Sequence, residues 1–140
     1  MSQTTNLSSH IQANIRAALD EDVGDLDLTA QLIPQHTQAH ATIITRQQMV
    51  LCGTQWLEGC FRALDTKCNI RWNLSEGEMA ETTQTLCEIR GNARAAHGGT
   101  RRSEFLQTIS ATATLTQYYV AAVRGTQTKI WVRARLLSVI

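Results

Sequence analysis

The sequence predicts one α+β domain in which helices back a small sheet. In three stretches, apolar residues recur every three or four positions, as they do along one face of a helix. Between these stretches lie short runs that are rich in β-branched residues and bounded by glycines or polar turns, which is typical of strands. The length of 140 residues suits one ordinary domain.

The first helix is expected over residues 10–22, from the spacing of Ile11, Ile15, Ala18 and Leu19. Ser9 and Gln12 have the spacing of a capping box at its start, and Gly24 is a suitable stop. A short helical turn is expected over residues 30–32.

Two strands are expected next, over Ala39–Arg46 and Met49–Cys52, and Gly53 marks the exit from the second. A second helix is expected over residues 54–64, where apolar residues again keep helical spacing. Thr54 is the candidate cap of this helix.

A further strand carries Ile70 and Trp72 on one side. A tight turn at Ser75–Glu78 leads towards another strand at Leu86–Ile89, which Gly91 is expected to end.

The longest helix is expected over residues 103–124, with Gly125 after its last turn. Its stepped residues include Phe105, Leu106, Ile109 and Val120, and we expect this apolar face to remain uncovered within the chain. The last segment, Thr128–Ile140, is expected to form a strand without a partner after it.

Composition and charge exclude some classes of function. The net charge of +1 gives no extended field for nucleic acid or an anionic membrane, and no apolar run is long enough to span a bilayer. The polar start of the chain has no secretory pattern, so a cytoplasmic location is expected. The four cysteines form no C-x-x-C pair, and we expect reduced, buried thiols.

Five stretches carry a pattern known from one enzyme family, in the same order and with similar spacing. They are Ala17–Gly24, Asp27–Ala30, Ala41–Arg46, Cys52–Trp56 and Phe105–Ser110. Together they resemble the quinolinate phosphoribosyltransferases, also called carboxylating nicotinate-nucleotide pyrophosphorylases.

The resemblance implies a hammerhead-like amino-terminal domain of a type II phosphoribosyltransferase over residues 1–108. Residues 109–140 would then be the first helix and strand of a truncated α/β barrel. Such a barrel needs on the order of 200 further residues, and its active site is built from many strand ends. We therefore expect no catalytic residue, metal or cofactor in this chain, and no turnover by the chain alone.

The family reaction joins quinolinate and phosphoribosyl pyrophosphate to give nicotinate mononucleotide, carbon dioxide and pyrophosphate, a step of de novo NAD biosynthesis. The resemblance implies these two substrates as partners of a full-length enzyme, with magnesium accompanying the pyrophosphate. It also implies a homodimer or a higher homo-oligomer. Arginines suit the carboxylates and phosphates of such substrates.

The family has an Arg in a Gly-Glu-Arg-Thr stretch, and that Arg reaches quinolinate in the neighbouring subunit's site. Here Ala96–Glu104 stands between matching flanks and is one residue short of the family pattern, which makes Arg101 the nearest candidate. After Ile130 the family continues with Leu-Asp-Thr-Arg-Lys-Thr, whose Arg and Lys bind substrate. Ala134 and Arg135 occupy those two positions, so Arg135 is the second candidate and the first function is lost.

The chain is thus expected to be out of register after Ile130. Both departures begin sharply beside well-matched flanks, which a shifted reading frame would produce. A degraded gene copy and a sequence error in a fragment are the alternatives. Resequencing the coding DNA would decide among them.

Other classes of function make different demands on the sequence. A swinging-arm carrier would need a lysine in the turn at Glu76–Glu78, but the two lysines are Lys67 and Lys129. His36 and His40 have metal-ligand spacing for a helix, although a strand is expected there. A non-catalytic interaction module that docks on a full-length enzyme remains the alternative to the enzyme itself.

Overall fold

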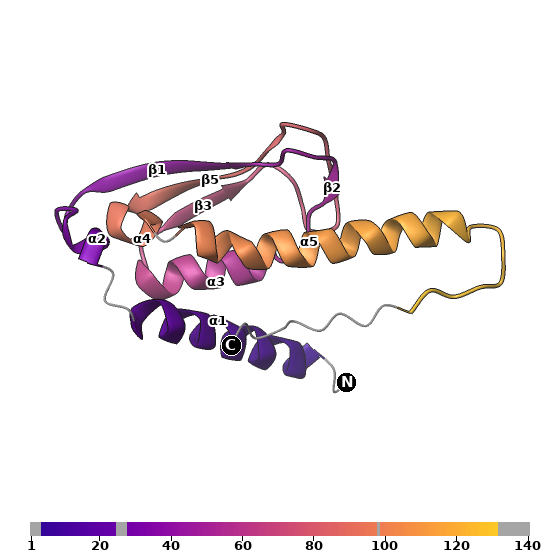
Figure 1. The fold of residues 1–140 in the computed structure, drawn as a ribbon, viewed down its shortest axis with the longest axis horizontal. Helices are drawn as coiled ribbons and strands as arrows, with labels where there is room; N and C mark the ends of the chain where they lie inside the picture. The colour runs from indigo at the N-terminus through magenta and orange to yellow at the C-terminus, as the bar shows by residue number, and fades with distance from the viewer. Residues whose placement is uncertain (1–3, 25–27, 98, 132–140) are drawn as a thin grey trace.

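The computed structural model describes residues 4–24, 28–97 and 99–131. Its elements are α1 (Thr4–Gly24), α2 (Leu28–Gln31), β1 (Gln38–Ile44), β2 (Met49–Val50), α3 (Thr54–Leu64), β3 (Asn69–Trp72), β4 (Met79–Ala80), β5 (Thr85–Asn92), α4 (Ala93–His97) and α5 (Gly99–Ala122). The domain has three layers, with a sheet over α3 and α5, and α1 packed on the far side of α3 (Figure 1). The chain is an α+β domain, as the sequence predicts.

The main sheet has the order β1-β5-β3, and both pairings are antiparallel. Since neighbouring strands are in register, alternate residues of all three share the face that looks towards the helices. Ile89 of β5, for example, lies opposite Ala41 on one side and Ile70 on the other. This face packs on Leu57 and Phe61 of α3.

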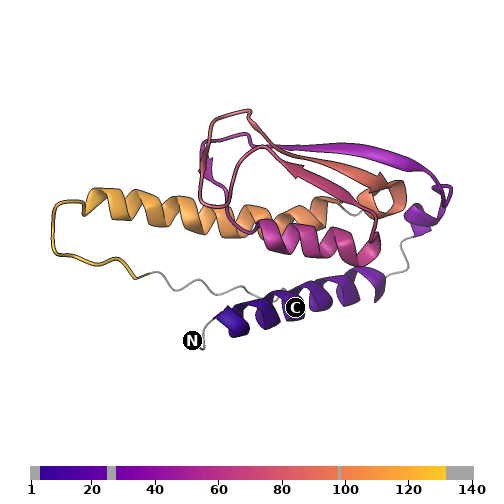
Figure 2. The ribbon, with the colours of Figure 1, turned by 180° about the vertical axis from the view of Figure 1, so that it is seen from behind.

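β2 and β4 form a separate two-stranded sheet beside the helix α5. Leu51, which follows β2, and Ala80 of β4 are buried together with Leu86 and Leu106. On its other side α3 packs against α1, where Ile11 and Ile15 contact Cys60. The far half of α5 continues past the sheet, as both views of the ribbon show (Figures 1 and 2).

Most of the expected elements are confirmed, and α3 has the expected bounds. The predicted ends of the helices and strands were less accurate. The first helix begins at Thr4, so Ser9 lies inside it and the predicted capping box is wrong. β5 continues past Gly91 to Asn92, because the ladder with β1 extends to that residue. The short elements β4 and α4 were not predicted.

The end of the chain differs from expectation. α5 begins four residues earlier than predicted, at Gly99 rather than residue 103, and Gly125 follows it with a φ of 88°. Thr128–Trp131 does not form a strand, and residues 132–140 lie outside the described part. The expected boundary at residue 108 falls within α5. Among the described residues, no helix is long and apolar enough to cross a membrane.

The apolar face of α5 is also placed differently. Leu106 is buried in the domain core, and Phe105 packs against the cluster of α1 and α3. Ile109 packs against Gly53, where an added Cβ would lie 3.1 Å from Ile109 Cδ1. Of the four residues expected to be uncovered, only Val120 is largely exposed, at 47%.

Candidate functional site

Arg101 is the third residue of α5, at the end of the domain where β5 leads into α4 (Figure 1). A cation in the first turn of a helix opposes the helix dipole, typically by about 0.3–1 kcal/mol. Helix stability therefore gives no reason for Arg101 and Arg102 to follow one another there. The side chains of residues 98–102 and the whole of Arg135 lie outside the described part.

The short helix α4 fixes the approach to this turn. The Arg94 backbone N–H donates to Asn92 Oδ1 at 2.9 Å, and Arg94 Nε donates to the carbonyl of Ile33 at 2.7 Å. Asn92 Nδ2 in turn donates to the Gln35 carbonyl at 2.7 Å. These bonds join the end of β5 to the segment before β1, so α5 begins from a well-anchored position.

A pocket of about 450 Å³ lies at the same end of the domain. Its basic side chains are His36, Lys67 and Arg90, and its carboxylate is Asp65. Gln38, Asn69, Gly91 and Asn92 complete the lining. Basic and amide groups of this kind can attract the oxygens of a carboxylate or a phosphate, but weakly where water competes.

Asp65 has a structural task in this pocket. Its two carboxylate oxygens accept backbone N–H groups of Asn92 at 2.8 Å and Lys67 at 2.9 Å. The Asn92 bond, followed by the Lys67 bond, lowers the pKa of Asp65 below its ordinary value. At Gly91 an added Cβ would lie 2.8 Å from Asp65 Oδ2, so a glycine lets the carboxylate approach the strand.

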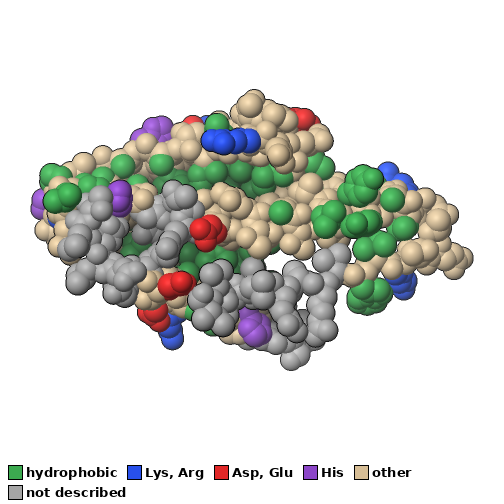
Figure 3. Space-filling view, in the orientation of Figure 1, with side chains coloured by type: hydrophobic (Ala, Val, Ile, Leu, Met, Phe, Trp, Pro, Cys, Tyr) green, Lys and Arg blue, Asp and Glu red, His purple; other side chains and the backbone are tan. Residues whose placement is uncertain are grey.

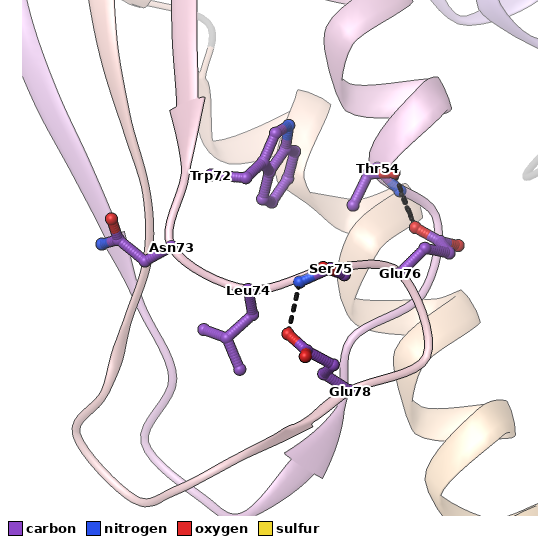
Figure 4. A pocket seen from close by; sticks show the side chains of 7 residues that line it. All are labelled: Thr54, Trp72, Asn73, Leu74, Ser75, Glu76 and Glu78. Atoms are coloured by element: carbon purple, nitrogen blue, oxygen red, sulfur yellow. Dashed lines mark hydrogen bonds between the residues drawn. The ribbon is translucent and has the colours of Figure 1, made fainter.

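A second cavity, of about 550 Å³, is lined by Thr54, Trp72, Asn73, Leu74, Ser75, Glu76 and Glu78 (Figure 4). Its lining is acidic, and Glu76 points to the amino-terminal end of α3 (Figure 4). Glu76 Oε1 accepts the Gly53 N–H at 2.7 Å. Oε2 accepts the N–H of Thr54 at 3.1 Å and its hydroxyl at 2.6 Å.

Glu76 thus caps α3 from a loop 23 residues away from Gly53. Burial disfavours the charged carboxylate, but the hydrogen bonds from the Thr54 hydroxyl, the Gly53 and Thr54 amides and the Cys52 thiol outweigh it and lower the pKa of Glu76. Thr54, the predicted cap, is the first residue of the helix, and Gly53 is the N-cap with a φ of 98°. The sequence could not predict Glu76 as the cap, because a cap supplied by a distant loop leaves no local pattern in the sequence.

None of the four cysteines forms a disulfide. Cys60 and Cys87 are buried, as expected, whereas Cys52 and Cys68 are only partly buried. Burial raises the pKa of Cys87 to about 12. Burial and the hydrogen bond to Glu76 raise the pKa of Cys52 to about 11. Neither thiol would be ionised at neutral pH, so neither suits the role of a nucleophile.

Within the described ranges, no three His, Cys, Asp or Glu side chains are grouped so that they could hold a metal ion. His36 precedes β1 and His40 lies within it. The two side chains therefore do not share a helical face, as a metal site with this spacing would require. His40 Nε2 lies 3.4 Å from Glu88 Oε2.

A model of the quinolinate phosphoribosyl transferase N-terminal domain matches residues 27–102, which is 76 of the 140 residues. The chain belongs to the quinolinate phosphoribosyltransferase family. The matched range contains both pockets, α4 and the first turn of α5.

Relatives of this phosphoribosyltransferase domain agree in sequence and in fold. The chloroplastic carboxylating nicotinate-nucleotide pyrophosphorylase of Oryza sativa subsp. japonica is 29% identical over 110 residues, which is 76% of this chain and 30% of the rice protein. The nicotinate-nucleotide pyrophosphorylase structure from Francisella tularensis has a TM-score of 0.76 and 31% identity, and the match covers 81% of this chain and 40% of that one. The structure from Ehrlichia chaffeensis has a TM-score of 0.73 and 27% identity, covering 81% and 42%.

The chain thus spans well under half the length of these relatives. The family model places the shared region in the amino-terminal domain. Arg101 and Arg135 remain the residues that the sequence predicts to bind substrate.

Proposed function

We propose that this chain is the amino-terminal domain of a quinolinate phosphoribosyltransferase and contributes to catalysis only together with a catalytic barrel. In the complete enzyme, quinolinate and phosphoribosyl pyrophosphate would give nicotinate mononucleotide, carbon dioxide and pyrophosphate. The match of the family model to residues 27–102 carries this proposal. The fold supports it, because the structure resembles solved members over 81% of the chain.

In this proposal the domain supplies a cation to a neighbouring subunit's active site in a homo-oligomer. Arg101 would meet a quinolinate carboxylate from the first turn of α5, which α4 and Asn92 hold in place. Arg135, further along the chain, would also bind substrate. A guanidinium binds a carboxylate through two parallel hydrogen bonds, which gives both affinity and orientation.

Turnover by the chain itself gives the first test. Pure chain supplied with labelled quinolinate, phosphoribosyl pyrophosphate and magnesium should form no nicotinate mononucleotide above the uncatalysed rate. The physical reason is that barrel loops, which hold the departing pyrophosphate, form most of such a site. Product formation by the pure chain would show that the proposed division of labour is wrong.

A chimera tests the positive part of the proposal. Residues 1–127 of this chain would replace the corresponding part of the Francisella tularensis relative, which is 31% identical. The chimera should have activity, and Arg101→Ala should lower its kcat/KM by about 100-fold or more, the usual range for a charged group on a reacting substrate. Arg102→Ala is the matched control, since it removes the same charge one position along α5. Equal losses in the two variants would contradict the assignment of Arg101.

A non-catalytic module that docks on a full-length enzyme is the second candidate. An inactive chimera together with specific binding of the chain to the intact relative would support this alternative.

A further inference from the structure

The pocket of about 450 Å³ beside the end of β5 has a polar lining. Its volume lies within the range of about 300–1,000 Å³ that is typical of ligand pockets. Among the described residues that line it, none has a hydrocarbon side chain. A ligand in this pocket would therefore be held by charge and hydrogen bonds, and not by apolar contact.

Separate segments of the chain bring the lysine and the arginine of this pocket together. Arg90 lies on the central strand β5, and its cross-strand partner in β3 is Asn69. Paired residues share one face of a sheet, so these two side chains stand next to each other. Lys67 comes from the turn before β3, where its backbone N–H donates to Asp65 Oδ1 at 2.9 Å. Lys, Arg and His side chains lie along the sheet in the space-filling view (Figure 3).

Asp65 is the one carboxylate among the described lining residues, and it would repel an anion. Its two oxygens, however, accept the backbone N–H groups of Asn92 at 2.8 Å and Lys67 at 2.9 Å. These bonds hold the carboxylate against the backbone and offset part of its charge. Lys67 and Arg90 together outweigh it, so the lining keeps an excess of positive charge even with His36 neutral.

Several polar side chains of the lining have no partner that would compete with a ligand. Within the described ranges, no hydrogen bond uses the side chains of Gln38, Asn69 or Lys67. Arg90 has one long ion contact, in which its Nη2 lies 3.8 Å from Glu88 Oε2, and its side chain is 69% exposed. These donors can therefore turn towards a ligand without breaking a strong internal bond.

We propose that this pocket binds a small phosphate monoester, with the phosphate group between Lys67 and Arg90. A phosphate monoester carries a charge of about −1.5 to −2 at pH 7 and has three terminal acceptor oxygens. It therefore matches two separate cations better than a carboxylate, which has one charge and two oxygens. The amides of Gln38 and Asn69 can both donate and accept, so they suit hydroxyl groups on the rest of the ligand. The proposal does not depend on Arg101 or on the activity of a complete enzyme.

NMR titration of the full ¹⁵N-labelled chain with glycerol 3-phosphate tests the pocket. Sodium chloride would be adjusted to hold the ionic strength at about 0.1 M, because screening alters every charged contact. The amide signals of Lys67, Arg90 and Gly91 should shift together and saturate. The expected dissociation constant is on the order of 1–10 mM, since both cations are exposed. Inorganic phosphate should shift the same signals but bind about two- to fivefold more weakly, because it lacks the hydroxyl groups.

Charge-removing variants locate the contact. Lys67→Gln and Arg90→Gln should each weaken binding about threefold or more. Arg71→Gln is the matched control, because Arg71 lies opposite Glu88 on the same face of the sheet but outside the pocket lining. It should leave the affinity within about 1.5-fold of the unmodified chain. Glu88→Gln removes the carboxylate that competes for Arg90, and should strengthen binding by about twofold.

The dispersion of amide signals in the same spectra would verify that each variant is folded, and Arg90→Gln carries the test if Lys67→Gln is not. Shifts that stay linear up to about 50 mM ligand would overturn the proposal. Equal weakening by Arg71→Gln and Arg90→Gln would do the same, because it would show a general effect of charge. Tighter binding of inorganic phosphate than of glycerol 3-phosphate would contradict the assignment of a monoester.

Discussion

The Glu76 carboxylate is expected to contribute strongly to the stability of the domain. It accepts three hydrogen bonds from Gly53 and Thr54 at the positive end of α3. Glu76→Gln keeps the size and one acceptor but removes the charge and turns an NH₂ group towards a donor. A hydrogen bond to a charged group is worth about 1.5–3 kcal/mol, and the Thr54 bonds are exposed, so we expect a net loss of about 2 kcal/mol.

Urea unfolding followed by far-UV circular dichroism would measure this loss, and the thermal midpoint should fall by about 6 °C. Glu78→Gln is the matched control in the same loop, since the Glu78 carboxylate accepts an exposed local bond from the Ser75 N–H at 2.6 Å. Its expected cost is about 0.5 kcal/mol. A Glu76→Gln loss no larger than that of Glu78→Gln would refute the capping role.

The same residue predicts a pH dependence. The pKa of Glu76 is lower in the folded protein than the value of about 4.3 for an unfolded glutamate. Its contribution is therefore fully present above that unfolded value, and is lost as the pH falls through the lower folded pKa. The stability difference between the unmodified chain and Glu76→Gln should be constant from about pH 7 to pH 5 and shrink below about pH 4. A difference that grew on acidification would contradict this sign.

Two further predictions concern the contact between α5 and the segment after β2. Gly53→Ala should lower the free energy of unfolding in urea by about 2–3 kcal/mol, because φ is 98° and the new Cβ would press on the Ile109 side chain of α5. Gly77→Ala is the control, since φ is 87° there but the space around it is open. It should cost only about 1 kcal/mol. Equal costs would show that the close approach is unimportant. Ser110→Ala should cost about 2 kcal/mol by leaving two partly buried backbone groups of Cys52 without the Ser110 hydroxyl. Thr112→Ala on the same helix should stay within about 0.5 kcal/mol. A small Ser110→Ala effect would mean that water replaces the hydroxyl.

The match of five short stretches to one family was available from the sequence, because their order is preserved even where single motifs are weak. The sequence did not determine whether Arg101 and Arg135 bind substrate, since these positions fall where the chain departs from the family pattern. Their roles therefore remain predictions.

The sequence by itself determined the type of most elements, the bounds of α3 and the family, because hydrophobic periodicity and local turn residues act over a few positions. Only the tertiary structure decided which face of α5 is buried. Phe105, Leu106 and Ile109 share a helical stripe with Val120, but the far half of α5 extends past the sheet (Figures 1 and 2), so the first three are covered and Val120 is not. The cap of α3 likewise depends on the tertiary structure, because the pairing of β3 with β5 places the loop that carries Glu76 beside Gly53.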